Sequence, residues 1–307
     1  MSEALNITVL GGGLMGHGIA LVMARAGHRA TVSDPVAEAL AAIPARVRES
    51  LGALEASDEE TADTLSRIAT EADLASAVAG ANVVFEAAPE KLPLKRSLFE
   101  QVEAYAPADA IVASNTSVIQ ITKIVEGRSS AHRMLGTHWW NPPHMIPLVE
   151  VIKTEWTDDR VAETMRSLLA DCGKTPVMVE KDVPGFIGNR LQHALWREAI
   201  SLVENGICDA KAVDTVIKAS FGRRLAVLGP LENADLVGTD LTLDVQQNVL
   251  FDLESRQSPS PYLKRLVEEG RLGMKTGEGF RNWTPEQASD VRSRLARYLT
   301  KLETILE

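Results

Sequence analysis

Short apolar runs alternate with helical patterns over the first 180 residues or so of the chain. The runs are typical of buried strands, which we expect at residues 6–10, 29–33, 82–87, 111–115, 134–138 and 175–179. Apolar residues at helical spacing predict helices from Leu14 onward, at 94–105 and at 159–172, and the charged stretch from Asp34 to about Ala75 is expected to be helical. This alternation predicts an α/β fold with a doubly wound, mainly parallel Rossmann-type sheet.

The pattern changes character from Pro184. One long amphipathic helix is expected over 186–204, where Asn205-Gly206 ends it, and Asp209 can cap a further helix through Ala219. Helical patterns continue from there, with breaks at 229–230 and 258–261. We therefore predict a sheet domain over residues 1–183 and a second, all-helical domain over 184–307.

A glycine cluster joins the first expected strand to the first expected helix, with the sequence Gly11-Gly12-Gly13-Leu14-Met15-Gly16. Strand, glycine turn and helix form the context in which this spacing indicates a dinucleotide-binding loop. Gly11 permits the sharp turn, Gly13 leaves room for a pyrophosphate, and Gly16 lets helix and strand pack closely. The amides that follow, at Leu14 and Met15, open a helix N-terminus that favours negative charge. The alternative is a glycine turn with a structural role only.

The second expected strand ends at Asp34, close to the distance from the glycines at which such loops place an acid for the adenosine ribose. A carboxylate there accepts hydrogen bonds from the ribose hydroxyls and repels a 2′-phosphate. Pro35 and Val36 follow, so no arginine is placed next to it to bind that phosphate. The sequence therefore predicts NAD rather than NADP as cofactor, although Asp34 could also be a loop cap.

The bulk composition narrows the class of protein further. The chain has 307 residues and a net charge of −10, which argues against nucleic-acid and anionic-membrane partners. We find no apolar run of transmembrane length, and residues 1–4 lack the positive charge of a signal peptide. Cys172 and Cys208 fit a reducing compartment, and no clustered Cys/His spacing indicates a metal. We expect a cytoplasmic protein without a metal site.

Polar residues stand where strands are expected to end, at the edge that faces the cofactor in such sheets. They are Asn115 and Ser117, then His138 and Glu150, with Asn189 near the start of the long helix. Oxidation of an alcohol needs a base for the hydroxyl proton, and histidine titrates near neutrality. Glu150 could orient the imidazole, and Ser117 and Asn189 could bind the reacting oxygen.

Several segments resemble the L-3-hydroxyacyl-CoA dehydrogenase family along nearly the whole chain. They are Ser114–Ser117, His138–Pro142, Leu148–Ile152, Asp182–Arg190 and Lys275–Phe280. The resemblance implies His138 as catalytic base with Glu150 as its partner, and Ser117 and Asn189 as contacts of the substrate oxygen. It also implies Asn141 as a polar group of the active site, and Glu90 and Lys95 as cofactor contacts. A homodimer held by the helical domain follows from the same resemblance.

Each of these residues also has a plainer interpretation. His138 could be a packed histidine, and Glu150 a solvated strand residue. Ser117 and Asn189 could be helix caps, which these residue types favour. A non-catalytic, dinucleotide-binding structural protein is the remote alternative for the whole chain, since a fold alone does not prove activity.

Two departures from the family concern the substrate. Residues 45–75 hold three arginines against eight acids, where members that use coenzyme A carry a lysine-rich segment; the alternative is a merely solvated face. The run from Phe221 to Pro230 resembles relatives that act on small free acids, such as gulonate, carnitine and pyridine-carboxylate dehydrogenases. Arg223 or Arg224 could clamp a substrate carboxylate there, or be a surface arginine. We therefore expect a small hydroxy acid or similar carboxylate-bearing alcohol as substrate, with a short-chain L-3-hydroxyacyl-CoA as the alternative.

Overall fold

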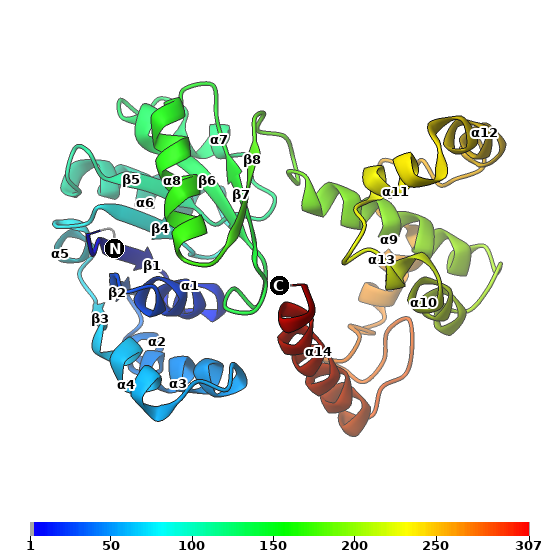
Figure 1. The fold of residues 1–307 in the computed structure, drawn as a ribbon, viewed down its shortest axis with the longest axis horizontal. Coiled ribbons are helices and arrows are strands. Elements are labelled where there is room, and N and C mark those ends of the chain that lie inside the picture. Colours follow the sequence, from blue (N-terminus) through cyan, green and yellow to red (C-terminus); the bar gives the residue numbers. More distant parts are fainter. Residues whose placement is uncertain (1–2, 307) are drawn as a thin grey trace. The chain divides into compact units, whose positions relative to one another are not determined.

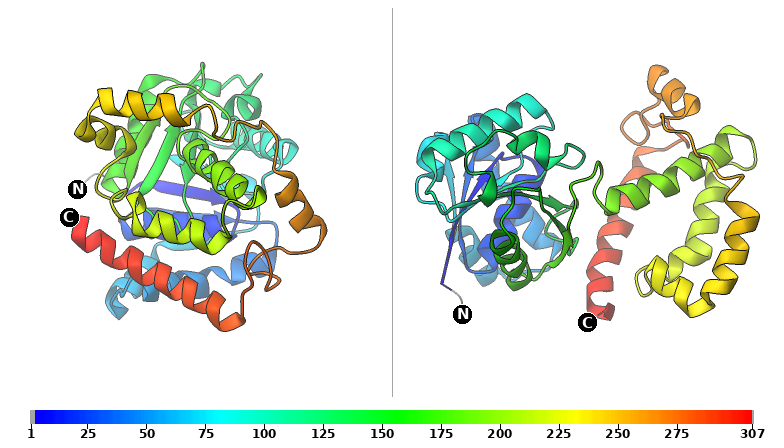
Figure 2. Two further views of the ribbon diagram at one scale, coloured as in Figure 1. Left: turned by 90° about the vertical axis from the view of Figure 1, so that its right-hand side faces the viewer. Right: turned by 90° about the horizontal axis from the view of Figure 1, so that it is seen from above.

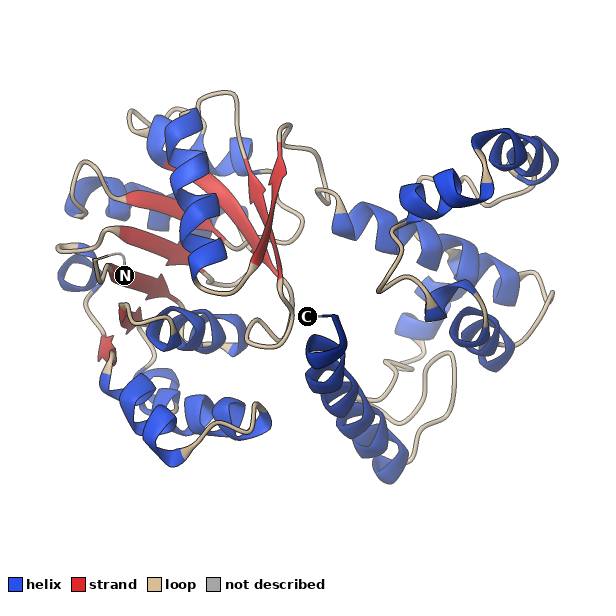
Figure 3. Ribbon diagram, viewed as in Figure 1, coloured by secondary structure: helices blue, strands red, loops and turns tan. Residues whose placement is uncertain are grey.

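The computed structural model describes the backbone of residues 3–306 and the side chains of residues 3–302. The expectation about a signal peptide concerned residues 1–4. Of these, Met1 and Ser2 lie outside the described residues. The chain divides into two compact units, Met1–Arg190 and Leu191–Glu307. In the described part of the chain, the named strands all lie in the first unit and the second consists of helices and loops (Figure 3). The domain boundary between residues 183 and 184 stays a prediction.

One eight-stranded sheet forms the centre of the first unit, with the order β3-β2-β1-β4-β5-β6-β7-β8 (Figure 1). Its strands are β1 (Asn6–Leu10), β2 (Arg29–Ser33), β3 (Ile68–Glu71), β4 (Val83–Glu86), β5 (Ile111–Ser114), β6 (Met134–Trp139), β7 (Leu148–Ile152) and β8 (Thr175–Val179). All neighbouring strands are parallel except β6 and β7. The predicted doubly wound, mainly parallel sheet is confirmed. The strand order reverses between β1 and β4, so a ligand crevice is expected at the carboxyl ends of these strands.

Helices cover both faces of this sheet (Figure 2). One face carries α1 (Leu14–Arg25), α2 (Ala37–Ala41), α3 (Ile43–Ala53), α4 (Asp58–Ser66) and α8 (Asp159–Asp171). The other carries α5 (Leu74–Val78), α6 (Leu92–Tyr105) and α7 (Ile121–Val125), and the short 3-10 helix η1 (Ala131–Arg133) precedes β6. Because both faces are covered, the central strands β1, β4, β5 and β6 are rich in buried apolar residues, which is why they could be predicted.

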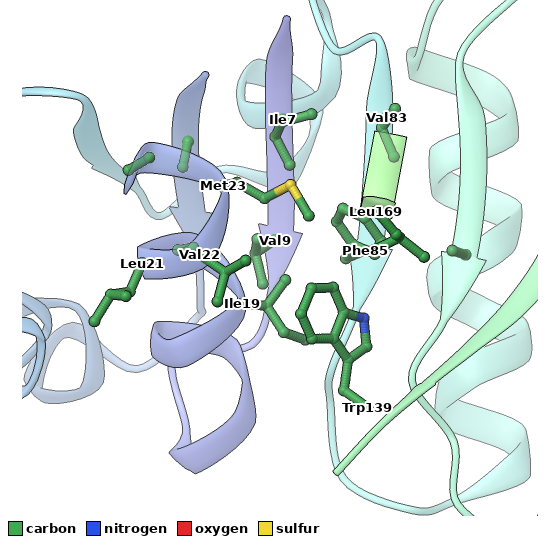
Figure 4. Close-up of a cluster of buried hydrophobic side chains, with 14 of the residues drawn as sticks. Ile7, Val9, Ile19, Leu21, Val22, Met23, Val83, Phe85, Trp139 and Leu169 are labelled. Atoms are coloured by element: carbon green, nitrogen blue, oxygen red, sulfur yellow. The ribbon is translucent and has the colours of Figure 1, made fainter. Parts of the chain in front are cut away.

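The core on the α1 face packs side chains of α1, β1, β4 and β6 together. Ile19 and Met23 of α1 are fully buried beside Val9 of β1 (Figure 4). Trp139, at the end of β6, meets Phe85 of β4 edge to face, with ring centroids 5.9 Å apart. This packing holds the residue that follows His138 in the core and so limits where the histidine can lie.

Two expectations from the sequence were wrong in this unit. The stretch to Ala75 is not wholly helical, because residues 68–71 form the edge strand β3, paired with β2. This strand has only four residues, none of them fully buried, and Thr70 and Glu71 interrupt any apolar run. The long helix α9 (Gly188–Glu204) begins two residues later than expected, because Gly185 and Phe186 have φ of +77° and +52°. A left-handed residue other than glycine costs about 1–3 kcal/mol.

The second unit continues α9 and adds a series of further helices. They are α10 (Ala210–Ala219), α11 (Pro230–Val237), α12 (Thr239–Val249), α13 (Pro261–Glu268) and α14 (Pro285–Leu306), with the 3-10 helix η2 (Phe221–Arg223) after α10. The predicted cap is confirmed, since the Asp209 carboxylate accepts a hydrogen bond from the Ala212 amide at 2.7 Å. Large apolar side chains of this unit remain exposed, among them Leu231 (80%) and Phe251 (83%).

Candidate active site

The glycine loop has the geometry that a dinucleotide requires. Gly11 has φ of +109°, and a Cβ atom on Gly16 would lie 1.8 Å from the Gly11 carbonyl oxygen. In contrast, a Cβ atom on Gly13 would meet no atom of the described structure within 4 Å. Gly13 is also the N-cap of α1 and supplies no side-chain hydrogen bond, which leaves the first amides, from Leu14 and Met15 onward, to an anion. The loop therefore fits the pyrophosphate of NAD.

Asp34 lies directly after β2 and holds this loop from the side. Its carboxylate accepts hydrogen bonds from the amides of Gly12 at 2.8 Å and Val36 at 2.9 Å. Arg46 of α3 donates to the Gly12 carbonyl oxygen at 2.6 Å. The sequence did not predict that this arginine lies near the loop. It stands 12 residues after Asp34 (46 − 34), in α3, and no local sequence signal connects the two residues. The backbone of Gly12 is thus held by the Asp34 carboxylate on its amide and by the Arg46 guanidinium on its carbonyl oxygen.

His138 and Glu150 face each other across the antiparallel pair β6–β7, where they are directly paired residues. Such cross-strand neighbours point to the same face of a sheet. The Nδ1 atom of His138 lies 2.7 Å from Oε2 of Glu150, and both residues are nearly buried, at 4% and 1% exposed. The plainer interpretation of Glu150 as a solvated strand residue is therefore wrong. The bond at Nδ1 leaves Nε2 as the ring nitrogen that can meet a substrate.

The other oxygen of Glu150 is bonded to the start of α9. Its Oε1 accepts hydrogen bonds from the amides of Ile187 at 2.8 Å and Gly188 at 3.0 Å. Burial by itself raises the pKa of Glu150, but the bonds from His138, Gly188 and Ile187 outweigh it and lower the pKa below its ordinary value. Glu150 therefore stays ionised beside the imidazole.

Ser117 lies in the loop that follows β5, and Asn189 lies in the first turn of α9. The two residues are in contact. The Asn189 side-chain amide donates to the Ser117 carbonyl oxygen at 2.9 Å. Ser117 is exposed and Asn189 half-buried, so both can meet a ligand. Asn115 is instead turned inward, where its side-chain oxygen accepts from the Trp139 amide at 3.0 Å and joins the ends of β5 and β6. Asn141 is exposed in the turn after β6.

Glu90 and Lys95 belong to a charged network behind the Ser117 loop. Lys95 is 1% exposed, and its ammonium group donates to the fully buried Glu86 at 2.8 Å and lies 3.3 Å from Glu90. Glu90 accepts from the Thr116 hydroxyl at 2.5 Å and the Ser117 amide at 3.0 Å. Burial raises the pKa of Glu90, but these hydrogen bonds and Lys95 outweigh it and lower that pKa. Lys95 is therefore placed to brace the loop from within the protein.

Arg223 and Arg224 lie in the second unit, at and just after η2. Both are exposed, and in the described part of the chain neither side chain has an ion pair or hydrogen bond. The carboxylate clamp stays a prediction.

The sheet, the glycine loop and the acid at the end of β2 define a dinucleotide-binding enzyme fold, and the His138–Glu150 pair adds an acid–base device. Comparison with known proteins gives the family. Residues 6–183 match 3-hydroxyacyl-CoA dehydrogenase, NAD binding domain, and residues 185–283 match 3-hydroxyacyl-CoA dehydrogenase, C-terminal domain. The chain belongs to the 3-hydroxyacyl-CoA dehydrogenase family, as the resemblance implied, and it is an NAD-dependent oxidoreductase.

Two curated relatives illustrate the range of the family. The 5-formyl-3-hydroxy-2-methylpyridine 4-carboxylate 5-dehydrogenase of Mesorhizobium japonicum is 36% identical over 309 residues, covering 98% of this chain and 98% of that protein. The mitochondrial hydroxyacyl-coenzyme A dehydrogenase of Homo sapiens is 40% identical over 286 residues, covering 90% of each.

Solved structures show the same two kinds of relative. The crystal structure of the pyridine-carboxylate 5-dehydrogenase, described as an NAD+-dependent dismutase, has a TM-score of 0.91 at 35% identity and covers 99% of both chains. The 3-hydroxybutyryl-CoA dehydrogenase of Escherichia coli K12 has a TM-score of 0.76 at 34% identity, covering 92% of this chain and 60% of that one.

Proposed function

We propose that this chain transfers hydride between NAD and the hydroxyl carbon of a small carboxylate-bearing substrate, with His138 as the base. The observation that carries the proposal is the 2.7 Å contact between Nδ1 of His138 and Oε2 of Glu150. A proton held on Nδ1 by this carboxylate leaves Nε2 free to accept one, which is the arrangement that a general base needs.

The steps at the protein follow from this arrangement. Nε2 of His138 accepts the substrate hydroxyl proton, and Glu150 stabilises the imidazolium that forms. Ser117 and Asn189 bind the reacting oxygen, and Asn141 lines the same site. The nicotinamide of bound NAD supplies the hydride acceptor. When NAD is bound, the open space at Gly13 and the amides of Leu14 and Met15 would receive its pyrophosphate, with Gly11 and Gly16 shaping the turn, and Asp34 would bind the ribose. Asn115, Glu90 and Lys95 would support the neighbouring cofactor-binding loop.

Replacement of the base tests this mechanism. We expect His138→Gln to lower kcat by a factor of about 10² to 10⁴, because general-base catalysis contributes about that much. The affinity for NADH, measured by fluorescence titration, should stay close to that of the wild-type protein. A kcat near the wild-type value would contradict the proposal, and tight NADH binding with no turnover of any substrate would support the non-catalytic alternative.

A free acid is favoured over an acyl-CoA by two observations. Residues 45–75 carry an acidic excess, which repels a polyanionic carrier. The pyridine-carboxylate dehydrogenase matches the chain over 99% of its length, including residues after 283 that the family domains do not reach. The named substrate of that relative carries a carboxylate, and we propose that Arg223 or Arg224 binds the equivalent group here. A short-chain 3-hydroxyacyl-CoA stays the second candidate, supported by the 40% identity to the human enzyme.

A substrate panel separates these two classes. NADH formation should be faster with carboxylate-bearing alcohols and aldehydes, pyridine carboxylates among them, than with 3-hydroxybutyryl-CoA. On the best free acid, Arg224→Met should raise KM at least about tenfold, because a bidentate arginine–carboxylate pair is among the stronger hydrogen-bonded contacts. Faster turnover of the acyl-CoA than of every free acid would reverse the assignment.

The assembly and location of the protein are proposed with it. We propose a homodimer formed through the helical unit, supported by exposed apolar residues such as Leu231, Leu236 and Phe251. We also propose a cytoplasmic location, supported by the free thiols of Cys172 and Cys208. No helix in the described part of the chain is long and apolar enough to cross a membrane.

A further inference from the structure

Phe186 has an unusual backbone conformation directly beside the proposed base. Its φ is +52°, and among the described residues only Glu55, at +57°, is another non-glycine residue with positive φ. Such angles are rare for bulky residues, and glycine adopts them without strain. Glycine even occupies the preceding position, Gly185, with φ of +77°. The contacts of its side chain should therefore explain why position 186 is a phenylalanine and not a glycine.

The side chain of Phe186 covers one side of the His138 imidazole. The two ring centroids lie 5.5 Å apart with the planes tilted by 50°, and Phe186 is 1% exposed. Trp140 provides a second aromatic contact, with its ring centroid 5.2 Å from that of His138. Both separations lie in the range of favourable aromatic pairs. Between these rings and Glu150, the imidazole has little freedom to rotate.

The residues that follow Phe186 complete the same enclosure. The amides of Ile187 and Gly188 bind Oε1 of Glu150. Gly188 also leaves the space that Trp140 needs, because a Cβ atom there would lie 2.4 Å from Cζ2 of the tryptophan. The left-handed turn at Gly185 and Phe186 thus lets one short segment contact the histidine, the glutamate and the tryptophan together.

We infer that Phe186 is a positioning residue, whose ring holds the His138 imidazole against Glu150 in the orientation that presents Nε2 to the substrate. This inference rests on the proposed role of His138 as base. The left-handed backbone at Phe186 places the ring contact and the two amide bonds to Glu150 in one short segment, which accounts for a phenylalanine where glycine would be unstrained. Phe186 is 1% exposed, so we assign it a role through His138 and Glu150 and no contact of its own with substrate or cofactor.

Phe186 also packs in the core formed by α6, α7 and neighbouring strands, so a change of stability alone cannot test its role. We choose Phe186→Leu, which keeps an apolar side chain of similar reach but removes the ring, and Phe186→Gly, which removes both ring and strain. Glu55→Gly is the matched control, because it relieves the same kind of strain at an exposed position outside the site.

For Phe186→Leu and Phe186→Gly we expect kcat, per folded enzyme at a temperature well below Tm, to fall about 10- to 100-fold, since small errors in catalytic geometry cost about this much. KM for substrate and NADH should change less than about threefold, because a side chain that is 1% exposed offers almost no surface to a ligand. In proton NMR, the low-field signal of the Nδ1 proton, assigned by its loss in His138→Gln, should broaden or disappear. Glu55→Gly should retain wild-type kcat and the signal.

Wild-type kcat and an intact Nδ1 signal in folded Phe186→Leu would overturn the inference, and so would a rise in KM with kcat unchanged. If His138→Gln is inactive, either of these results contradicts only the role of Phe186, and the proposed function is retained. If His138→Gln is active, the proposed base is wrong and the positioning role falls with it. The two failures are therefore distinguishable.

Discussion

At the scale of single residues, Lys95 is buried behind the site, with its ammonium group between the carboxylates of Glu86 and Glu90. His138, Glu150, Ser117 and Asn189 could be named because they lie in motifs that resemble the family, although Glu150 stands in the middle of β7 and not at a strand end. The burial of Lys95 between Glu86 and Glu90 could not be predicted, since it depends on two loops and a helix packing together. Arg46 was missed for the same reason. Lys95, expected at the cofactor, is a buried partner of two carboxylates.

The buried lysine gives a prediction about stability. Lys95→Met should lower the free energy of unfolding by about 3–5 kcal/mol, because removing one partner leaves the buried Glu86 carboxylate without its cation. Urea unfolding followed by circular dichroism measures this loss.

Arg25→Met is the control for Lys95→Met. Arg25 pairs with Glu60 on the surface, where an ion pair contributes about 0–1 kcal/mol. Equal effects of the two substitutions would show that the Glu86–Lys95 pair is no more important than a surface pair.

At the scale of secondary-structure elements, the sheet could be predicted because its central strands are buried on both faces. The edge strand β3 was missed, since a four-residue strand paired on one side, with no fully buried residue, lacks an apolar run. The reversal at β7 was not predicted either, although it is what places Glu150 opposite His138. A parallel pair needs a crossover of about a dozen residues or more, usually with a helix, whereas residues 140–147 form a short connection without one. This connection requires the antiparallel direction, but the sequence pattern had not indicated a strand at residues 148–152.

The turn between β1 and α1 predicts two different effects of one added methyl group. Gly13→Ala should fold normally and weaken NADH binding at least about tenfold, because its Cβ would occupy the open space where the pyrophosphate approaches. Gly16→Ala should unfold the protein or lower its Tm strongly, because its Cβ would overlap the Gly11 carbonyl. Binding is measured by fluorescence titration and folding by thermal denaturation.

Gly52→Ala, in α3, is the control for both glycine variants. A Cβ atom there meets no atom of the described structure within 4 Å, and alanine should stabilise the helix by about 0.5–1 kcal/mol. Wild-type NADH affinity in Gly13→Ala would contradict the assigned path of the pyrophosphate.

At the scale of the whole molecule, the helical unit leaves many large apolar side chains exposed, and such side chains often mark an interface when they form one patch. The stretch from Leu225 to Leu253 holds many of these apolar residues. It also carries five acids and no lysine or arginine. The acids are Glu232, Asp235, Asp240, Asp244 and Asp252. Sequence alone could predict helices here, but not which of their faces are left uncovered within one chain.

This surface predicts the oligomeric state. Leu236→Asp or Phe251→Asp should convert the proposed dimer to a monomer, measured by light scattering coupled to size exclusion, because a buried charge weakens an interface at least about 100-fold. Tyr105→Asp, at an exposed aromatic residue of the first unit, should leave the mass unchanged. A wild-type protein that is monomeric at micromolar concentration would refute the proposed dimer.

The hydrogen bonds from Ile187 and Gly188 to Glu150 also bear on how chimaeric enzymes should be built. Exchange of the helical unit with that of a relative invites a splice at residues 183–184, where the change in sequence pattern is most visible. That junction would import foreign amides and a foreign aromatic ring around the recipient's histidine. A splice after Arg190 would instead transfer the helices and keep the recipient's own acid–base pair intact.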